Sequence, residues 1–589
     1  MMNPWSWVLG GLLAYWLLVA LLDDRGLLPD SVGTTGPILT VHTKRGRALL
    51  DTLAGPRRLW RVWANLGLGF AYVILAGAFL LLISNAFLVL RNPPQPTAIN
   101  QPQNFLVIPG VNDFLPLAVA PEIVLGLFLG MLVHEGGHGI LSRVGDIEVE
   151  SMGVVLLAIL PIGAFVEPDE ESVEAADRGT RARMFAAGVT NNFLLTAIAF
   201  ALLFGPVVGS IAVAPGAAVG GAFPGSPAAQ ADIGSGDRIV AVGDQAVRTN
   251  DDLGVALDDA SADTVPVTLA DGTQKDVERS VLVTGVTADS PFSSLGTNAT
   301  IRSVNGTTVQ TEAGLARALA NVTVATLETA DGAQATGPVG ALTVAVPGEP
   351  AAEAGLPTDG TAVVTHIGGE RILSHRSLNA VLAGYEPGET VSVTTAGDSG
   401  TEPYQVDLGS QDGESYLGVQ VYRGYSGLVV SDFGAKLYPA GAYLGMVGGD
   451  STGPGIVGFL RAIGVNLLLP LVGSVGIGGL EYNFAGFVAS NAGFYTVQGP
   501  LAPLGGGVFI LANLLFWTGW INLNLGVFNC IPAFPLDGGH LLRMAAEGVV
   551  SRLPIDDRQI AVRAITTSVG VTMLVALLLM LFGPQLLSP

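Results

Sequence analysis

Residues 131–140 read MLVHEGGHGI and lie inside an apolar run that extends from Ile123 to Leu141. An HExxH pattern on a helix places its two histidines, here His134 and His138, one turn apart on the same face, so both imidazoles can reach one metal ion. Glu135 lies beside them, close enough to act on a water molecule at that ion. The segment therefore predicts a metal site with a general base inside a hydrophobic helix.

A hydrogen-bonded structural cluster is the alternative explanation for two histidines and a glutamate on such a helix. Ionisable groups within membrane spans cost about 2.5–3.5 kcal/mol each on insertion scales, so a functional role is the default interpretation. The chain has six histidines in total, and two of them fall in this one pattern. Both observations favour the metal site.

The composition indicates a membrane protein. Only 13% of the 589 residues are charged, compared with about 25% in soluble domains, and the mean hydropathy is +0.53. Several apolar stretches have about the 20 residues that cross a bilayer. They cover residues 4–22, 66–90, 117–141, 184–207, 505–528 and 564–583. We expect the first to be a retained span, because no basic region precedes it and no small-residue cleavage site follows it.

The net charge of −22 argues against nucleic acid or an anionic membrane surface as a partner, because both attract concentrated Lys and Arg and the sequence has no polybasic patch. Lysine is nearly absent, and acidic residues crowd the polar central region. This composition is typical of proteins that work in very high salt, and it predicts a halophilic archaeal source. Cys530 is the only cysteine, which excludes an intramolecular disulfide and a Cys-rich metal site.

The central region, 208–450, is rich in Gly, Asp and Thr and contains an internal repeat. PGSPAAQADIGSGDRIVAVGDQAV (224–247) recurs as PGEPAAEAGLPTDGTAVVTHIGGERI (347–372), and a more degenerate copy, ADSPFSSLGTNATIRSVNGTTV (288–309), lies between them. Each copy alternates glycine turns with β-branched runs and a helix-like run. The pattern resembles PDZ domains of the protease-associated kind and predicts two or three of them.

A second motif supplies the third ligand that a catalytic zinc site needs. NLGVFNCIPAFPLDGGHLL (524–542) follows an apolar span, and its prolines and glycines break the helix so that Asp537 is presented at membrane depth. Read alone, the motif is a turn at a helix start with Asp537 as N-cap. His540 lies three residues further on, and we do not include it as a ligand.

HEGGH in one span and N-x-x-P-x-x-x-L-D-G-G in a later one together resemble the site-2 protease family of intramembrane metalloproteases, over roughly 117–207 and 505–545. The resemblance implies one zinc ion per chain held by His134, His138 and Asp537. It also implies that Asn529 holds substrate near the metal, and that the PDZ-like domains are inserted between two catalytic membrane halves.

Two further segments resemble family elements. AAGVTNNF (186–193) matches a family pattern in which an asparagine, here Asn192, stabilises the oxyanion, although Val189 stands where the family has proline. MGVVLLAILPIGAFVEPDEE (152–171) resembles a membrane-dipping strand segment that lines the substrate path, and a short interfacial hairpin is the alternative.

Basic residues in short loops predict the orientation, because cytoplasmic loops carry the excess of Lys and Arg. They cluster in the first loop (Lys44, Arg45, Arg47, Arg57, Arg58, Arg61), before the fourth apolar stretch (Arg178, Arg181, Arg183) and after the fifth (Arg543, Arg552, Arg558, Arg563). The N-terminus and the PDZ-like region are then extracytoplasmic. Residues 455–480 are apolar but contain Pro470 and many glycines, which favours a re-entrant element or a pairing with 484–504.

The sequence therefore predicts a polytopic α-helical membrane protein of about six to eight membrane elements, with inserted α+β PDZ-like domains. The expected parts are an N-terminal transmembrane region (1–116), a first catalytic half (117–207), the PDZ-like repeats (208–450), re-entrant or paired segments (451–504) and a second catalytic half (505–589).

The expected function is zinc-dependent cleavage of single-pass membrane proteins, with the catalytic centre in the cell membrane towards the cytoplasmic side. The product would be released into the cytoplasm in regulated intramembrane proteolysis. Glu135 is the expected base, and Asn192 and Asn529 are expected to assist it. The PDZ-like domains would bind peptides or exclude bulky ectodomains. The alternatives are an inactive scaffold or chaperone of the same fold, a metal transporter, and a membrane-anchored soluble zincin.

Overall fold

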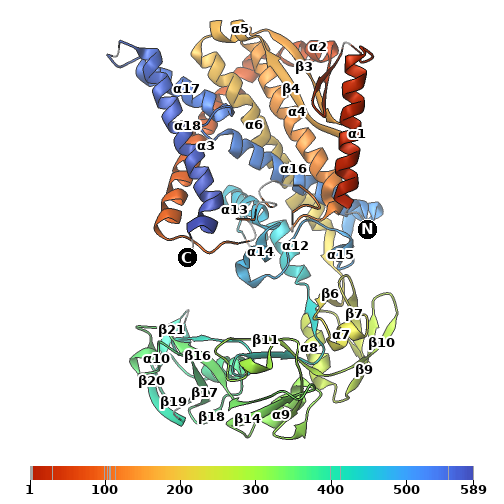
Figure 1. The fold of residues 1–589 in the computed structure, drawn as a ribbon, viewed down its shortest axis with the longest axis vertical. Coiled ribbons are helices and arrows are strands. Elements are labelled where there is room, and N and C mark those ends of the chain that lie inside the picture. Colours follow the sequence, from red (N-terminus) through yellow and green to blue (C-terminus); the bar gives the residue numbers. More distant parts are fainter. Residues whose placement is uncertain are drawn as a thin grey trace. The chain divides into compact units, whose positions relative to one another are not determined.

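The computed structural model describes residues 4–29, 31–97, 100–101, 104, 108–112, 114–158, 160–397, 400–411, 413–450, 452–554 and 556–587. The chain forms two compact units. Residues 1–212, 441–488 and 497–589 make up the first, which we call the helical unit. Residues 213–440 and 489–496 make up the second, which we call the β unit. We describe each unit separately (Figure 1).

Within the described residues, five helices are long and apolar enough to cross a membrane. They are α3 (Arg57–Arg91), α4 (Ala120–Val144), α6 (Arg178–Leu202, with further helical turns to Ser210), α16 (Gly507–Asn529) and α18 (Arg558–Leu587). A further 21-residue apolar helix, α1, covers Pro4–Asp24. All six coincide with the predicted apolar stretches. The shorter helices outside residues 213–439 are α2 (Lys44–Leu53), α5 (Glu170–Ala175), α12 (Ala440–Gly448), α13 (Gly455–Leu468), α14 (Val472–Val475), α15 (Ala489–Ala492) and α17 (Asp537–Val550).

Helices α4, α6 and α16 pack against one another at the centre of the helical unit (Figure 1). Small residues make the close approach possible, as is usual between helices in a membrane. A Cβ added at Gly126 of α4 would lie 3.2 Å from the backbone of Thr518, and one at Gly130 would lie 3.0 Å from the Asn522 side chain. On α16, a Cβ at Gly519 would lie 2.7 Å from the Phe200 ring of α6. The three helices are thereby held at a short separation around the HExxH segment.

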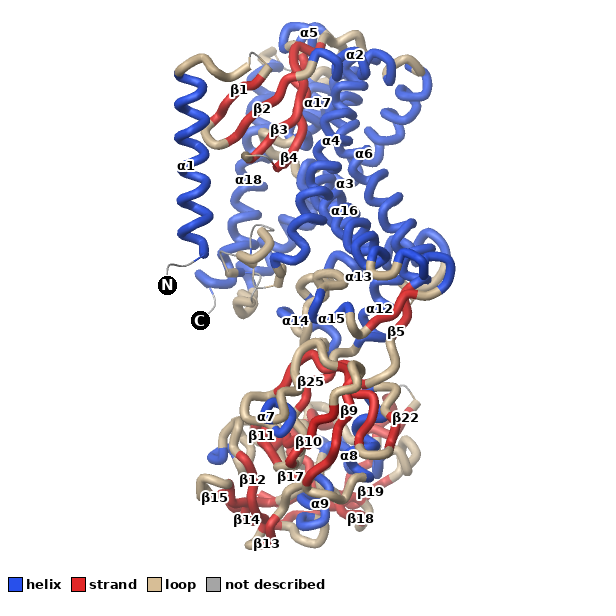
Figure 2. The backbone as a smooth tube through the Cα atoms, turned by 90° about the vertical axis from the view of Figure 1, so that its right-hand side faces the viewer, coloured by secondary structure: helices blue, strands red, loops and turns tan. Residues whose placement is uncertain are grey.

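A four-stranded antiparallel sheet accompanies these helices, in the order β1 (Val32–Thr35), β2 (Ile38–His42), β3 (Val149–Leu157) and β4 (Leu160–Pro168) (Figure 2). The β3–β4 hairpin is the segment for which we expected a membrane-dipping strand or an interfacial hairpin. β4 is an edge strand and packs against α4. The pair β1–β2 was not anticipated, because we read that stretch only as a basic loop.

The part of the helical unit between residues 441 and 488 is broken into short helices and loops. α13 has 14 residues and is therefore about 21 Å long, short of the ~30 Å hydrocarbon core of a bilayer. Side chains of α16 bind the backbone of this segment: the Asn513 amide pairs with both backbone groups of Phe487, Trp517 donates to the Ala485 carbonyl, and Trp520 donates to the Leu467 carbonyl. A re-entrant course for this segment stays a prediction.

The β unit contains three six-stranded sheets with the same strand order. Module 1 consists of β6 (Ala217–Ala222), β7 (Arg238–Val242), β8 (Gln245–Ala246), β9 (Thr264–Leu269), β10 (Gln274–Glu278), β25 (Ala435–Leu437) and α8 (Asn250–Asp259). Module 2 consists of β11 (Val281–Val286), β12 (Thr300–Val304), β13 (Thr307–Thr308), β14 (Val324–Thr329), β15 (Gln334–Pro338), β24 (Leu428–Ser431) and α9 (Glu312–Leu319). Module 3 consists of β16 (Ala341–Ala345), β17 (Ala362–Ile367), β18 (Glu370–Arg371), β19 (Thr390–Gly397), β20 (Gly400–Asp407), β23 (Val419–Val421) and α11 (His375–Leu382).

The three modules are nested inside one another. The chain completes all but one strand of module 1, then of module 2, and then forms module 3 with its closing strand β23. It next supplies β24 to module 2 and β25 to module 1. Each module has its own cluster of buried apolar side chains. The degenerate middle repeat therefore folds as completely as the other two.

Candidate metal centre

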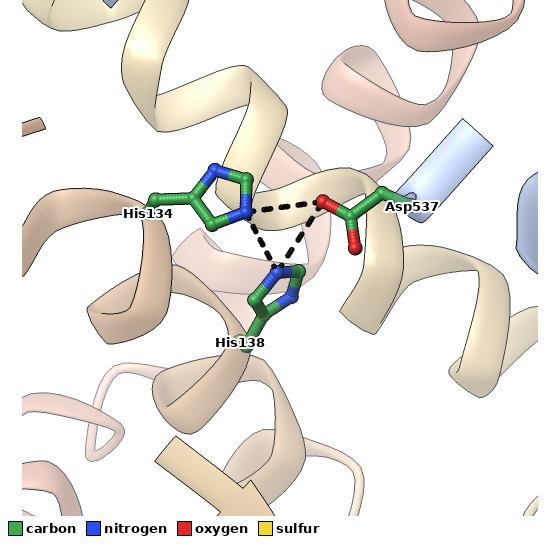
Figure 3. A group of neighbouring side chains, drawn as sticks. All are labelled: His134, His138 and Asp537. Carbon is green, nitrogen blue, oxygen red and sulfur yellow. Dashed lines mark hydrogen bonds and ion pairs between the residues drawn. The ribbon is translucent and has the colours of Figure 1, made fainter. Parts of the chain in front are cut away.

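His134 and His138 project from α4 towards Asp537, the first residue of α17 (Figure 3). Asp537 Oδ2 lies 3.1 Å from His134 Nε2 and 3.4 Å from His138 Nε2, and the two imidazole nitrogens are 3.2 Å apart. All three side chains are at most 12% exposed. Residues about 400 positions apart in the sequence therefore present three potential ligand atoms to one point.

Hydrogen bonds on the far side of the rings set the imidazole orientation. His138 Nδ1 lies 2.9 Å from the Met184 carbonyl oxygen, so Nδ1 carries the proton and Nε2 keeps its lone pair for a metal ion. His134 Nδ1 lies 3.2 Å from the Asn192 amide nitrogen, while the buried Asn192 Oδ1 has no hydrogen-bond partner. Oxygen and nitrogen of an amide are assigned from the network. Exchanging them would let Asn192 Oδ1 accept from His134 Nδ1 and leave His134 Nε2 free as a ligand.

The residues present fit a zinc ion. Asp537 Oδ2 is buried and has no hydrogen-bond partner, although it faces two imidazole nitrogens. Two histidines and one carboxylate with a fourth position open to water form a usual ligand set of catalytic zinc. Gly188 of α6 forms the floor of the site, because a Cβ there would lie 2.7 Å from His138 Nε2 and 2.8 Å from His134 Nε2.

The other predicted site residues are not among the three side chains of this cluster. Glu135 turns towards the sheet, where its Oε2 accepts a hydrogen bond of 3.1 Å from the Val166 N–H of β4. Asn529 is the last residue of α16 and is partly exposed. His540 stacks on Phe185 with ring centroids 4.1 Å apart, and it is not part of the cluster.

Sequence reasoning missed the residues that support the site from α6. Asn191 donates to the Val133 carbonyl of α4 and accepts from the Trp63 indole of α3, so it ties three helices together beside His134. Gly188 and the Met184 carbonyl also belong to this support. A signal was present, since the polar pair Asn191–Asn192 interrupts an apolar helix, but only Asn192 was assigned a role.

The family model described as Peptidase family M50 matches residues 122–358 and 431–577. The chain belongs to this family. The resemblance to site-2 proteases is thereby confirmed, and the family together with the five apolar helices identifies a multi-pass membrane protein with additional β domains. Residues 359–430, between the two matched intervals, hold most of module 3, and both sequence motifs fall inside the matched intervals.

Two relatives are distant. An uncharacterised protein of Methanocaldococcus jannaschii is 27% identical over 190 residues, which cover 32% of this chain and 48% of that protein. A membrane-bound transcription factor site-2 protease homolog of Arabidopsis thaliana is 26% identical over 149 residues, which cover 25% of this chain and 28% of that protein. The chain thus matches about half of the length of the first relative and under a third of the second.

Proposed function

We propose that this M50 member is an intramembrane zinc metalloprotease that hydrolyses peptide bonds of transmembrane substrates. The observation that carries the proposal is the convergence of His134, His138 and Asp537 at the centre of packed apolar helices. Burying ionisable side chains inside a membrane span costs free energy, so a cluster of this kind indicates a functional site. Glu135, the side chain next to the first ligand, supplies the general base that hydrolysis requires.

When bound, zinc supplies Lewis-acid chemistry that polarises the scissile carbonyl and makes water more acidic. Glu135 takes a proton from the attacking water and hands it to the leaving amine. Its Oε2 accepts a hydrogen bond from the Val166 N–H of β4, which leaves the other carboxylate oxygen for the water.

Asn192 is best suited to positioning His134. It is fully buried and lies 3.2 Å from His134 Nδ1, and a partner on the outer nitrogen of a metal-binding histidine fixes the ring and raises ligand affinity. Stabilisation of the oxyanion, which the family resemblance implies for Asn192, is the second candidate role. Asn529 is proposed to contact substrate.

A substrate would reach the site as an extended segment. β4 is an edge strand beside the HExxH helix, and an edge can accept an added strand through backbone hydrogen bonds. A transmembrane helix must unwind to expose a carbonyl, so substrates with helix-weakening residues should be preferred.

The proposed orientation places the arginine-rich starts of α6 and α18 in the cytoplasm, and cleavage would release a product there.

The modules of the β unit would be extracytoplasmic PDZ-like domains. The loop before each closing strand contains a glycine with positive φ (Gly418, Gly427 and Gly434), a conformation that glycine adopts without strain. These domains would bind peptide ends or exclude bulky ectodomains.

An inactive scaffold of the same fold and a metal transporter are the competing functions. A comparison of wild type with Glu135→Gln separates them, using cleavage of a model transmembrane substrate and bound zinc as readouts. We expect both proteins to bind one zinc per chain and only the wild type to cleave. Glu171→Gln, at an exposed site on α5, is the matched control and should cleave normally. Failure of the wild type to cleave any of several substrates while zinc is bound would favour the scaffold.

A further inference from the structure

A cavity of about 760 Å³ lies between α17, α18 and the start of α6, outside the metal centre. Its lining includes Arg178, Arg543, Arg558 and Arg563. Arg178 comes from a different part of the chain than the other three, and all four belong to the loops used above to predict orientation. Figure 1 shows α5, which directly precedes α6, and the α17–α18 connection at the same end of the helical unit.

The cavity is positively charged although the chain is strongly acidic. Four of its twelve lining residues are arginines and one is acidic, whereas Lys and Arg make up 27 of 589 residues overall. The acidic residue, Glu547, is already paired with Arg543 at 3.3 Å and with Arg181 at 3.2 Å. Across the described residues, no ion pair is recorded for Arg178, Arg558 or Arg563, and all three are exposed.

Two walls of the cavity, formed by α17 and α18, each present one helical face that combines charged residues with one valine. α18 contributes Val562, Arg563 and Thr566, at the spacing of a single helical face. α17 contributes Arg543, Glu547 and Val550 at the same kind of spacing, and Phe534 adds an aromatic ring. The α18 wall runs from Arg558 to Thr567, which is about 14 Å along a candidate membrane span.

We propose that this cavity binds the headgroup of an anionic phospholipid. The arginines at the helix starts would hold the phosphate, and the apolar lining residues Val562, Val550 and Phe534 would contact the glycerol and the first acyl carbons. Basic pockets between membrane helices recognise anionic headgroups in this way. A free phosphate ion would satisfy the arginines but would leave the apolar part of the wall uncovered.

The proposal departs from an expectation drawn from the sequence. We argued against an anionic membrane surface as a partner because the sequence has no polybasic patch. The structure gathers arginines from the start of α6, from α17 and from the start of α18 into one cavity. Because α17 begins at Asp537, a lipid bound between α17 and α18 would also stabilise the helix that presents this carboxylate to the metal centre.

The test uses the purified full-length chain in a zwitterionic detergent, at the lowest ionic strength at which the wild type stays folded. The midpoint of thermal unfolding is measured with short-chain phosphatidylglycerol, with phosphatidylcholine of the same chain length, and with inorganic phosphate. We expect phosphatidylglycerol alone to raise the midpoint. The double variant Arg558→Gln/Arg563→Gln should weaken its apparent affinity at least tenfold, whereas Arg558→Lys/Arg563→Lys should largely retain it.

The matched control is Arg58→Gln/Arg61→Gln, which removes the same charge at the start of α3, where neither arginine lines this cavity. An equal loss of affinity in this control would overturn the proposal, because phosphatidylglycerol would then bind cationic surfaces in general and not this cavity. An equal effect of phosphatidylcholine would show that the headgroup charge is not recognised. A shift produced by inorganic phosphate alone would replace the lipid with a phosphate ion.

Discussion

The two glycines between the ligand histidines have different roles. A Cβ on Gly136 would meet nothing within 4 Å. A Cβ on Gly137 would lie 2.7 Å from the Asn191 amide and 2.9 Å from the Ala187 carbonyl oxygen of α6. The second contact involves backbone, so α4 and α6 would have to separate. The motif is therefore tightly packed on one side and open on the other.

We predict opposite effects for alanine at these two adjacent positions. Gly136→Ala should be neutral or stabilising by up to about 1 kcal/mol, because alanine favours a helix over glycine. Gly137→Ala should destabilise the protein by about 1–3 kcal/mol, as overpacking does, and should lower bound zinc. Thermal unfolding and metal analysis of the two variants check this, and equal behaviour would contradict the packing described for α4 and α6.

Asn192 gives a second prediction at the level of one residue. If Asn192 positions His134, Asn192→Ala should weaken zinc affinity by roughly 10- to 100-fold, and Asn192→Asp, which can still accept from His134 Nδ1, should retain most of the affinity. Competition with a zinc chelator measures this in the absence of substrate. Loss of cleavage with unchanged zinc affinity would assign Asn192 to the oxyanion instead.

Among the structural elements, the connections between nested modules show how the β unit is held together. Arg279 lies where the chain leaves module 1 for module 2, and Asp432 lies where it returns. Their side chains form a buried ion pair, and Asp432 also accepts from the Glu312 N–H at the start of α9. Arg371 connects module 3 to module 2 by donating to the Val322 and Val339 carbonyls.

We predict that Arg279→Met destabilises the β unit by about 3–5 kcal/mol, because Asp432 is left buried and without its cation. The double variant Arg279→Met/Asp432→Leu should recover much of this loss. The pair Arg376–Glu312 is the control, since its nitrogen and oxygen are 3.8 Å apart and Arg376 is 79% exposed, so Arg376→Met should cost about 1 kcal/mol or less. Thermal unfolding measures all three variants, and equal losses for Arg279→Met and Arg376→Met would be inconsistent with a buried connection.

An element can be predicted from the sequence when the pattern that defines it lies within one short stretch of the chain. Long apolar helices such as α3 and α18 are defined by their own composition, and HExxH is complete within one turn and a half. The pair β1–β2 was missed because its partner β3 lies more than 100 residues away. The nesting of the modules was missed because closing strands as short as β25 carry almost no pattern of their own. The approach of Gly188 to the histidines depends on the packing of α4 on α6, which no local pattern records.

For the whole molecule, the excess of 49 acidic over 27 basic residues predicts dependence on salt. Like charges repel in the compact state, and salt at about 1 M reduces the screening length to about 3 Å. The unfolding midpoint should therefore rise steadily between 0.2 M and 3 M KCl. A flat or falling midpoint over this range would contradict the prediction of a halophilic protein.

The measurement that tests the central claim most directly is the zinc content of purified, folded protein for the wild type, Glu135→Gln and Asp537→Ala. The claim is that His134, His138 and Asp537 together hold one ion. We predict one zinc per chain in the wild type and in Glu135→Gln, and a loss of most of the zinc in Asp537→Ala. Full zinc content in folded Asp537→Ala, or no zinc in the folded wild type, would contradict the assignment of this site.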